Sequence, residues 1–65
     1  MKDYSSREVI AILKADGWQE VDCNGDHHQF KHPLKKGRVT VAHPRKSLSI
    51  NMLKSIEHQA KIKFK

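Results

Sequence analysis

The fold is decided by residues 18–42, which read WQEVDCNGDHHQFKHPLKKGRVTVA and contain three short segments separated by two turns. Apolar residues that alternate with polar ones over a few positions are typical of strands buried on one side only. Asn24-Gly25 is a strong signal for a hairpin turn, and Pro33 to Gly37 forms a second turn. The stretch therefore predicts three antiparallel strands, over about residues 18–23, 27–32 and 38–42.

One helix is expected before these strands in the sequence and a second one after them. Ser5 and Glu8 have the spacing of a capping box, and Gly17 is suited to end the helix, which predicts a helix over about residues 6–16. Asn51 is a plausible N-cap for a second helix over about residues 51–61. The order predicts an α+β fold, α-β-β-β-α, with both helices on one face of the sheet. The buried stripe of the second helix should comprise Met52, Leu53, Ile56 and Ala60.

The alternation along the second strand separates its side chains into two sets. Phe30 should face the core, so His28 and His32 share its side of the strand. The open face should then present three polar side chains in one row, those of His27, Gln29 and Lys31.

The charge is unevenly distributed along the chain. Thirteen Lys and Arg residues against seven Asp and Glu give a formal net charge of +6, and Glu57 is the only acid after Asp26. Such an excess attracts a polyanion such as RNA, and an acidic protein partner would be attracted by the same field. We expect the phosphate backbone of RNA to be contacted by Lys31, Lys35, Lys36, Arg38, Arg45 and Lys46.

Length and cysteine content limit the class of protein. The 65 residues are enough for one domain, 1–65, with a compact core. The single cysteine, Cys23, excludes an intramolecular disulfide and suits a reducing cytoplasm, where we expect the protein to act. No stretch approaches the length of a membrane-spanning helix, so no membrane association is expected.

His27 is the leading candidate for a catalytic group. It follows a glycine-containing turn whose backbone N–H groups are free to bind phosphate oxygens. Cleavage of RNA needs a base for the 2′-OH proton and an acid for the leaving 5′-oxygen, and imidazole suits either role. His28 and His43 are possible supporting residues, and Lys31 is a third option for the complementary proton transfer. The alternative is that His27 is an exposed strand histidine without a function.

A metal site is not expected. Cys23, His27, His28 and His32 crowd into one hairpin, with His43 farther along, whereas a structural zinc site usually shows two paired ligand motifs. Alternation would also place His27 and His28 on opposite faces. We expect Cys23 to be a small, half-buried side chain and the protein to need no metal, cofactor or small molecule.

The chain resembles the HicA family, the toxins of HicA–HicB toxin–antitoxin modules. The resemblance is carried by GDHHQFKHP at 25–33 and GRVTVAHP at 37–44, with DGW at 16–18 and LKSIEHQA at 53–60. It implies a double-stranded-RNA-binding-domain-like fold and a metal-independent RNase that cleaves mRNA and arrests translation. It also implies a HicB-type antitoxin that masks the catalytic histidine. The family's catalytic histidine, two residues after a glycine, falls on His27.

Three positions depart from the family pattern. Asp26 replaces the usual serine, Ala42 a proline, and Lys61 a glycine. A carboxylate beside the histidine repels phosphate, although it also favours a protonated imidazole. Two other functions remain open on account of the basic surface: a non-catalytic RNA-binding module, and a small basic adaptor for an acidic protein partner.

Overall fold

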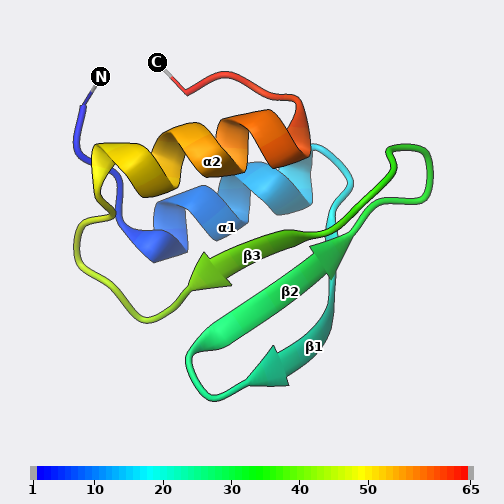
Figure 1. The fold of residues 1–65 in the computed structure, drawn as a ribbon, viewed down its shortest axis with the longest axis horizontal. Coiled ribbons are helices and arrows are strands. Elements are labelled where there is room, and N and C mark those ends of the chain that lie inside the picture. The colour runs from blue at the N-terminus through cyan, green and yellow to red at the C-terminus, as the bar shows by residue number, and fades with distance from the viewer. Residues whose placement is uncertain (1, 65) are drawn as a thin grey trace.

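The computed structural model describes residues 2–64, and its elements follow the predicted order (Figure 1). Helix α1 spans Ser6–Ala15 and helix α2 spans Ile50–Ala60. Between them lie strands β1 (Gln19–Asn24), β2 (His27–Lys31) and β3 (Val39–Ala42). The strands form one antiparallel sheet in the order β1-β2-β3. The predicted α-β-β-β-α class is confirmed.

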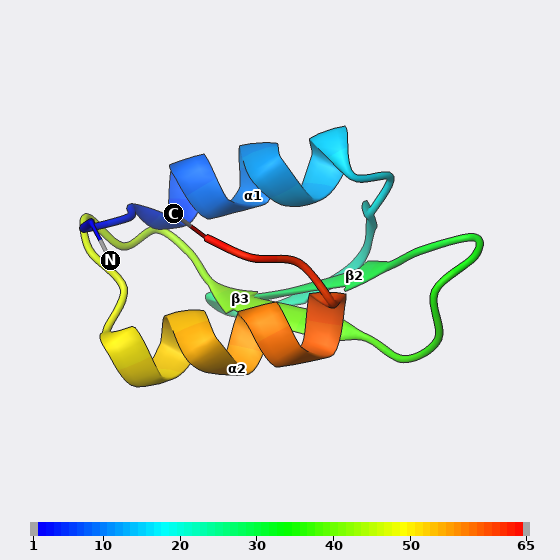
Figure 2. The same cartoon turned by 90° about the horizontal axis from the view of Figure 1, so that it is seen from above.

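The helices gather at the β3 side of the sheet. They run side by side above β3 in Figure 1, and β3 runs between them when the molecule is seen from above in Figure 2. Helix α2 also reaches the free edge of β3, where the Thr40 N–H donates to the Gln59 side-chain oxygen at 3.3 Å. All six residues of β1 are exposed. The core is therefore built at β3, and the β1 side of the sheet is left open.

The core is formed by apolar side chains of the sheet, of both helices and of the C-terminal segment. Trp18, Phe30, Val39 and Val41 are at most 1% exposed, which confirms that Phe30 faces the core as predicted. Residues 61–64 return across the two helices (Figures 1 and 2), and the centroid of the Phe64 ring lies 5.0 Å from that of Tyr4. The core is completed by Val9 and Leu13 of α1 and by Leu53, Ile56 and Ala60 of α2. No helix within residues 2–64 has the length and apolar character needed to cross a bilayer.

Helix α1 begins as the capping box predicts. Ser5 is the N-cap and its side chain accepts from the Glu8 N–H at 3.1 Å, while the Glu8 carboxylate accepts from the Ser5 N–H at 3.0 Å. The helix ends at Ala15, with Asp16 as its C-cap, and Gly17 follows with a φ of +105°. The predicted start of α1 is thus confirmed, and its end lies one residue earlier than predicted.

Strand β1 contains an irregularity that the sequence did not predict. Glu20 pairs with Phe30 and Asp22 with Gln29, so Val21 is an extra residue without a partner opposite. Val21 is 50% exposed, and Cys23 is exposed rather than half-buried as predicted. The reason is that neither helix reaches β1. The hairpin turn also lies one residue later than predicted, at Gly25-Asp26, since Asn24 already pairs with His27.

The start of α2 differs from the prediction. Asn51 is inside the helix, and the N-cap is Ser49, whose side chain accepts from the Met52 N–H at 3.2 Å. Both residue types are good N-caps, so the sequence did not distinguish them. The helix ends at Ala60, and its C-cap, Lys61, adopts the left-handed conformation with a φ of +55°. A glycine at that position would adopt this conformation without strain.

The N-cap assignment leads to a stability prediction. Ser49→Ala should lower the free energy of unfolding by about 1 kcal/mol, because the Met52 N–H loses its acceptor. Asn51→Ala, at an exposed helix position, should change the free energy of unfolding by less than about 0.5 kcal/mol. Urea unfolding of the two variants measures this difference. Equal losses, or a larger loss for Asn51→Ala, would contradict the assignment.

Candidate functional site

His27 lies at the end of the sheet where the β1–β2 turn meets the end of β3. It is the first residue of β2 and pairs with Ala42, the last residue of β3. The tight turn before it depends on Gly25, whose φ of +64° is left-handed. The His27 side chain is 63% exposed. The backbone of His27 is thus fixed by strand pairing, while its imidazole is exposed and accessible to a large substrate.

Asp26 forms an ion pair that bears directly on His27. Its Oδ2 lies 2.6 Å from Nη2 of Arg45, and its Oδ1 lies 3.8 Å from Nε2 of His27. The hydrogen bond from Arg45 holds the pKa of the Asp26 carboxyl below its usual range. Asp26 is therefore ionised at neutral pH, and its charge is balanced by Arg45. The carboxylate repels phosphate less than an isolated one would.

The loop after β3 is fixed to the start of α1 through Ser6, which is 1% exposed. The Ser6 hydroxyl lies 2.6 Å from Nδ1 of His43 and accepts from the Arg45 N–H at 2.8 Å. The Ser6 N–H donates to the Arg45 carbonyl at 3.0 Å. These bonds place His43 and Arg45 beside the first turn of α1.

An open cleft of about 540 Å³ lies at the same end of the molecule. It adjoins the turn that holds His27, because the His43 N–H donates to the Asp26 carbonyl at 2.8 Å and Arg45 contacts the Asp26 carboxylate. The cleft is lined by Ser6, Arg7, His43, Pro44, Arg45 and Lys46. Three cations and an imidazole make it suited to a phosphate group.

The three candidate histidines do not form one cluster. The rings of His28 and His43 meet edge to face with centroids 5.1 Å apart. Nδ1 of His28 lies 3.2 Å from the Glu20 carboxylate, and its Nε2 lies 3.7 Å from Sγ of Cys23. His27 points to the other face of β2, as the alternation predicts, so it is separated from the other two.

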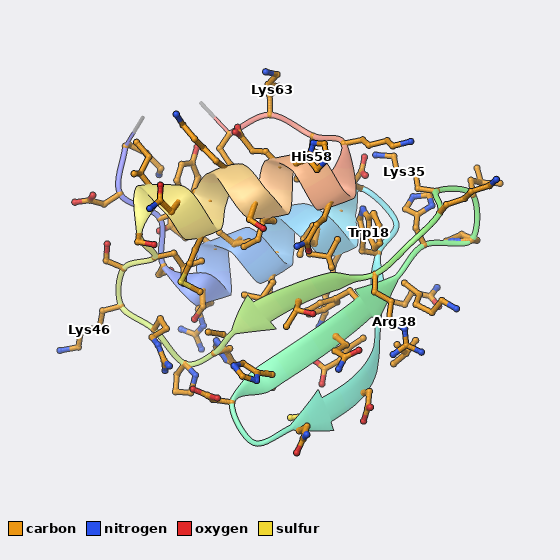
Figure 3. All side chains as sticks on the ribbon, in the orientation of Figure 1. Trp18, Lys35, Arg38, Lys46, His58 and Lys63 are labelled. Carbon is orange, nitrogen blue, oxygen red and sulfur yellow. The ribbon has the colours of Figure 1, made fainter. Side chains whose placement is uncertain are left out.

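The six basic residues predicted to contact RNA divide between two ends of the sheet. Arg45 contacts Asp26, and Lys46 follows it in the loop after β3, so both lie at the His27 end of the sheet. Lys35 and Arg38 lie at the opposite end from Lys46, as Figure 3 shows. Lys31 and Lys36 belong to the second group, since β2 runs about 13 Å from His27 to Lys31. The two groups are too far apart to contact one phosphate.

Two members of the distant group also have contacts within the fold. The Lys35 ammonium binds the Asp16 carboxylate at 2.6 Å and the Ala60 carbonyl at 3.0 Å. Its hydrogen bond keeps the pKa of Asp16 below the usual range. Arg38 donates to the Gln29 side-chain oxygen at 2.8 Å. Lys35 therefore contributes to the structure, while Arg45 and Lys46 are better placed to act with His27.

Sequence reasoning missed Ser6 and Arg7 as parts of the site and missed the pairing of Asp26 with Arg45. No sequence pattern linked Ser6 to the site, because it is 37 positions from His43 and was interpreted only as part of a helix start. Asp26 and Arg45 are oppositely charged and flank two strands that were predicted to end together. That charge pair was available from the sequence.

Comparison with known proteins identifies the family of this chain. No curated protein matches the chain. The model of one family, described as the HicA toxin of bacterial toxin–antitoxin systems, matches residues 6–62. This range begins at the first residue of α1 and includes every strand, both helices and all residues of the cleft. The chain belongs to the HicA toxin family.

Proposed function

We propose that this HicA-family toxin is an RNA endonuclease that cleaves mRNA in the cytoplasm and arrests translation, with His27 as the general acid and base. The observation that supports this most is the position of His27. It is an exposed imidazole at a strand end that is paired with β3, beside a cleft that contains Arg7, Arg45 and Lys46. The net charge of +6 attracts RNA to this surface.

The chemistry needs one proton to move between two oxygens. A base removes the proton from a ribose 2′-OH, and the resulting oxygen attacks the adjacent phosphorus. The bond from phosphorus to the 5′-oxygen then breaks, and that oxygen takes up a proton. The products are a 2′,3′-cyclic phosphate and a 5′-hydroxyl. His27 can accept the first proton and deliver it to the leaving oxygen, which requires only one imidazole.

The placement of the other candidates favours this single-imidazole assignment. His28 has a partner on each ring nitrogen and lies on the other face of β2. His43 is bound to Ser6 and contacts His28. Lys31 shares the face of His27 but lies about 13 Å along the strand. These residues are better placed to support the fold or to contact neighbouring nucleotides.

Arg45 is the cation best placed to bind the reacting phosphate. It contacts Asp26, the residue next to His27, and it lines the cleft. A guanidinium presents several N–H donors that match phosphate oxygens, and it stabilises the charge that develops on phosphorus during attack. Lys46 and Arg7 would hold flanking phosphates, whereas Lys31, Lys36 and Arg38 would contact the strand farther away.

The test is cleavage by the purified chain. A labelled single-stranded RNA should be cut with and without EDTA, and the products should carry 2′,3′-cyclic phosphate ends. RNA binding without cleavage at any pH would favour a binding module instead. No affinity for RNA together with tight binding to a neighbour-encoded protein would favour an adaptor. Either result would overturn the proposal.

The toxin–antitoxin class implies a partner, and we propose a HicB-type antitoxin that covers His27. A partner seated on the His27 end of the sheet would block RNA and shield the imidazole from solvent. Carbethoxylation of His27 should then slow at least about tenfold in the complex, while that of the exposed His58 on α2 stays unchanged. Equal protection of both histidines, or of neither, would contradict this placement.

Replacing Asp26 by the family's serine should strengthen RNA binding. Asp26→Ser removes the carboxylate that pairs with Arg45, so the guanidinium becomes free to contact a phosphate. We expect the Kd for RNA at low salt to fall several-fold. The slope of log K against log salt should steepen by up to about 0.7, the value for one phosphate contact on a single strand, because Asp26 no longer competes with phosphate for the donors of Arg45.

The control for this variant is Asp3→Ser. Asp3 is exposed and outside the cleft, and its replacement changes the net charge by the same amount. Salt titrations of RNA binding should show a steeper slope for Asp26→Ser alone. The same change in both variants would mean that net charge, rather than the release of Arg45, is responsible.

A further inference from the structure

Glu20, Cys23 and His28 gather on the face of the β1–β2 hairpin opposite to His27. One ligand atom from each lies within 4.8 Å of the other two. Sγ of Cys23 is 3.7 Å from Nε2 of His28, and Oε2 of Glu20 is 3.2 Å from its Nδ1. The thiol also donates to the Gly25 carbonyl at 3.4 Å. Sulfur, imidazole nitrogen and carboxylate oxygen are the three ligand types that Zn²⁺ takes in proteins.

The irregularity at Val21 creates this cluster. Residues 20 and 23 would point to opposite faces of a regular strand, because side chains alternate. The extra residue in β1 shifts the alternation. Glu20 therefore lies on the same face as its partner Phe30, and Cys23 on the same face as its partner His28. Cys23 and His28 are direct cross-strand partners, which places their side chains next to each other. Bulges of this kind are frequent beside functional sites.

The distances suit a tetrahedral ion. Bonds of about 2.3 Å from zinc to sulfur and about 2.0–2.1 Å to nitrogen place the two ligand atoms about 3.6 Å apart. The separation of Sγ and Nε2 is 3.7 Å. Glu20 accepts from Nδ1 and thereby leaves the lone pair of Nε2 directed at the sulfur, as in carboxylate–histidine–zinc sites. The edge contact with His43 further restricts the ring of His28.

We propose that Cys23 and His28, with Glu20 as a third ligand or as the residue that orients His28, bind a thiophilic divalent cation such as Zn²⁺. The site is independent of the RNA chemistry, because His27 projects from the other face of β2. It would clamp β1 to β2 at the part of the sheet that neither helix covers. The metal would thus stabilise the hairpin that carries His27.

Binding is tested with Co²⁺ and Zn²⁺ on the purified, reduced protein. One equivalent of Co²⁺ should give a thiolate-to-metal absorption band, which Zn²⁺ abolishes. Cys23→Ser and His28→Gln should each weaken Zn²⁺ binding by at least about 100-fold, and Glu20→Gln by about 10-fold or more. His58→Gln, at an exposed site on α2, is the matched control and should bind like the wild type.

Two further measurements do not depend on the absorption band of Co²⁺. Zn²⁺ at 100 times its Kd should raise the Tm by about 10 °C or more, and this shift should vanish in Cys23→Ser. Because Cys23 is the only cysteine, its alkylation rate reports on the site alone, and Zn²⁺ should slow it at least tenfold.

The proposal fails if Co²⁺ gives no thiolate band, or if His28→Gln binds as well as His58→Gln. It also fails if Zn²⁺ leaves both the Tm and the alkylation rate unchanged. Cys23 and Glu20 are exposed, so their variants should remain folded, and circular dichroism checks this. A failure here leaves the RNA cleavage test unaffected, since that test is made in the presence of EDTA.

Discussion

His27→Ala should reduce RNA cleavage by about 10²–10⁴-fold, which is the typical contribution of a positioned acid–base group. In cells, expression of the variant should no longer arrest growth. The expectation follows from the placement of His27, an exposed imidazole with Arg45 and the cleft nearby. Single-turnover cleavage of a labelled RNA measures the chemical step directly.

The loss should not arise from unfolding or from weaker binding. The His27 side chain is 63% exposed, and Asp26, at 3.8 Å, is its one charged contact within residues 2–64. Substitutions at such sites usually change the free energy of unfolding by less than about 0.5 kcal/mol. The Kd for RNA should change little, because phosphate contacts by Arg and Lys dominate affinity.

The matched control is His58→Ala, which removes an exposed histidine from α2 and should cleave RNA at the wild-type rate. Cleavage by His27→Ala at an unchanged rate would exclude His27 as the catalytic group. His43, which lines the cleft, would then be the next candidate for the catalytic group. A comparable rate loss in both variants would point to a general effect of removing imidazoles.

The strands were predictable because their signals are local. The alternation of side chains and the turn after the first strand depend only on neighbouring residues, and the structure confirms that Phe30 faces the core. Which face of β2 carries His27 followed from the same alternation. The extra residue at Val21 did not follow, since a bulge of one residue leaves no mark in an exposed strand.

The position of His27 at the start of a strand was predictable from the sequence, whereas the contacts around it were largely not. Ser6 and His43 are 37 positions apart, so their contact depends on the tertiary fold. The pairing of Asp26 with Arg45, 19 positions apart, could have been inferred from their opposite charges at strands expected to end together. The separation of the basic residues could have been predicted. The loops before and after β3 must lie at opposite ends of that strand, so Lys36 and Lys46 could not share one phosphate.

His32→Ala should lower the free energy of unfolding by about 2–4 kcal/mol, a large effect in so small a domain. Nε2 of His32 donates to the Asp16 carbonyl at 2.7 Å, and Nδ1 accepts from the N–H groups of Leu34 and Lys35 at 3.0 and 3.1 Å. The ring also meets the edge of Trp18, with centroids 5.3 Å apart. One side chain thus joins the end of α1, the core and the β2–β3 turn.

Fluorescence of Trp18, the only tryptophan, reports unfolding in urea. The expected loss corresponds to a fall in Tm of about 10 °C or more. His58→Ala should shift the Tm by only a few degrees, because His58 is exposed and its side chain forms no hydrogen bond to another residue within residues 2–64. Similar values for the two variants would show that the contacts of His32 contribute little.

A second substitution tests whether Gly17 and His32 act as one unit. A Cβ atom at Gly17 would lie 2.7 Å from Nε2 of His32, and the φ of +105° already strains any other residue. Gly17→Ala should therefore cost more in the wild type than in His32→Ala, where the clash is absent and the backbone strain of about 1–2 kcal/mol remains. The double variant should thus be more stable than the sum of the single losses predicts. Additive losses would mean that the backbone conformation alone requires glycine, and that the imidazole is held by its hydrogen bonds without close packing against residue 17.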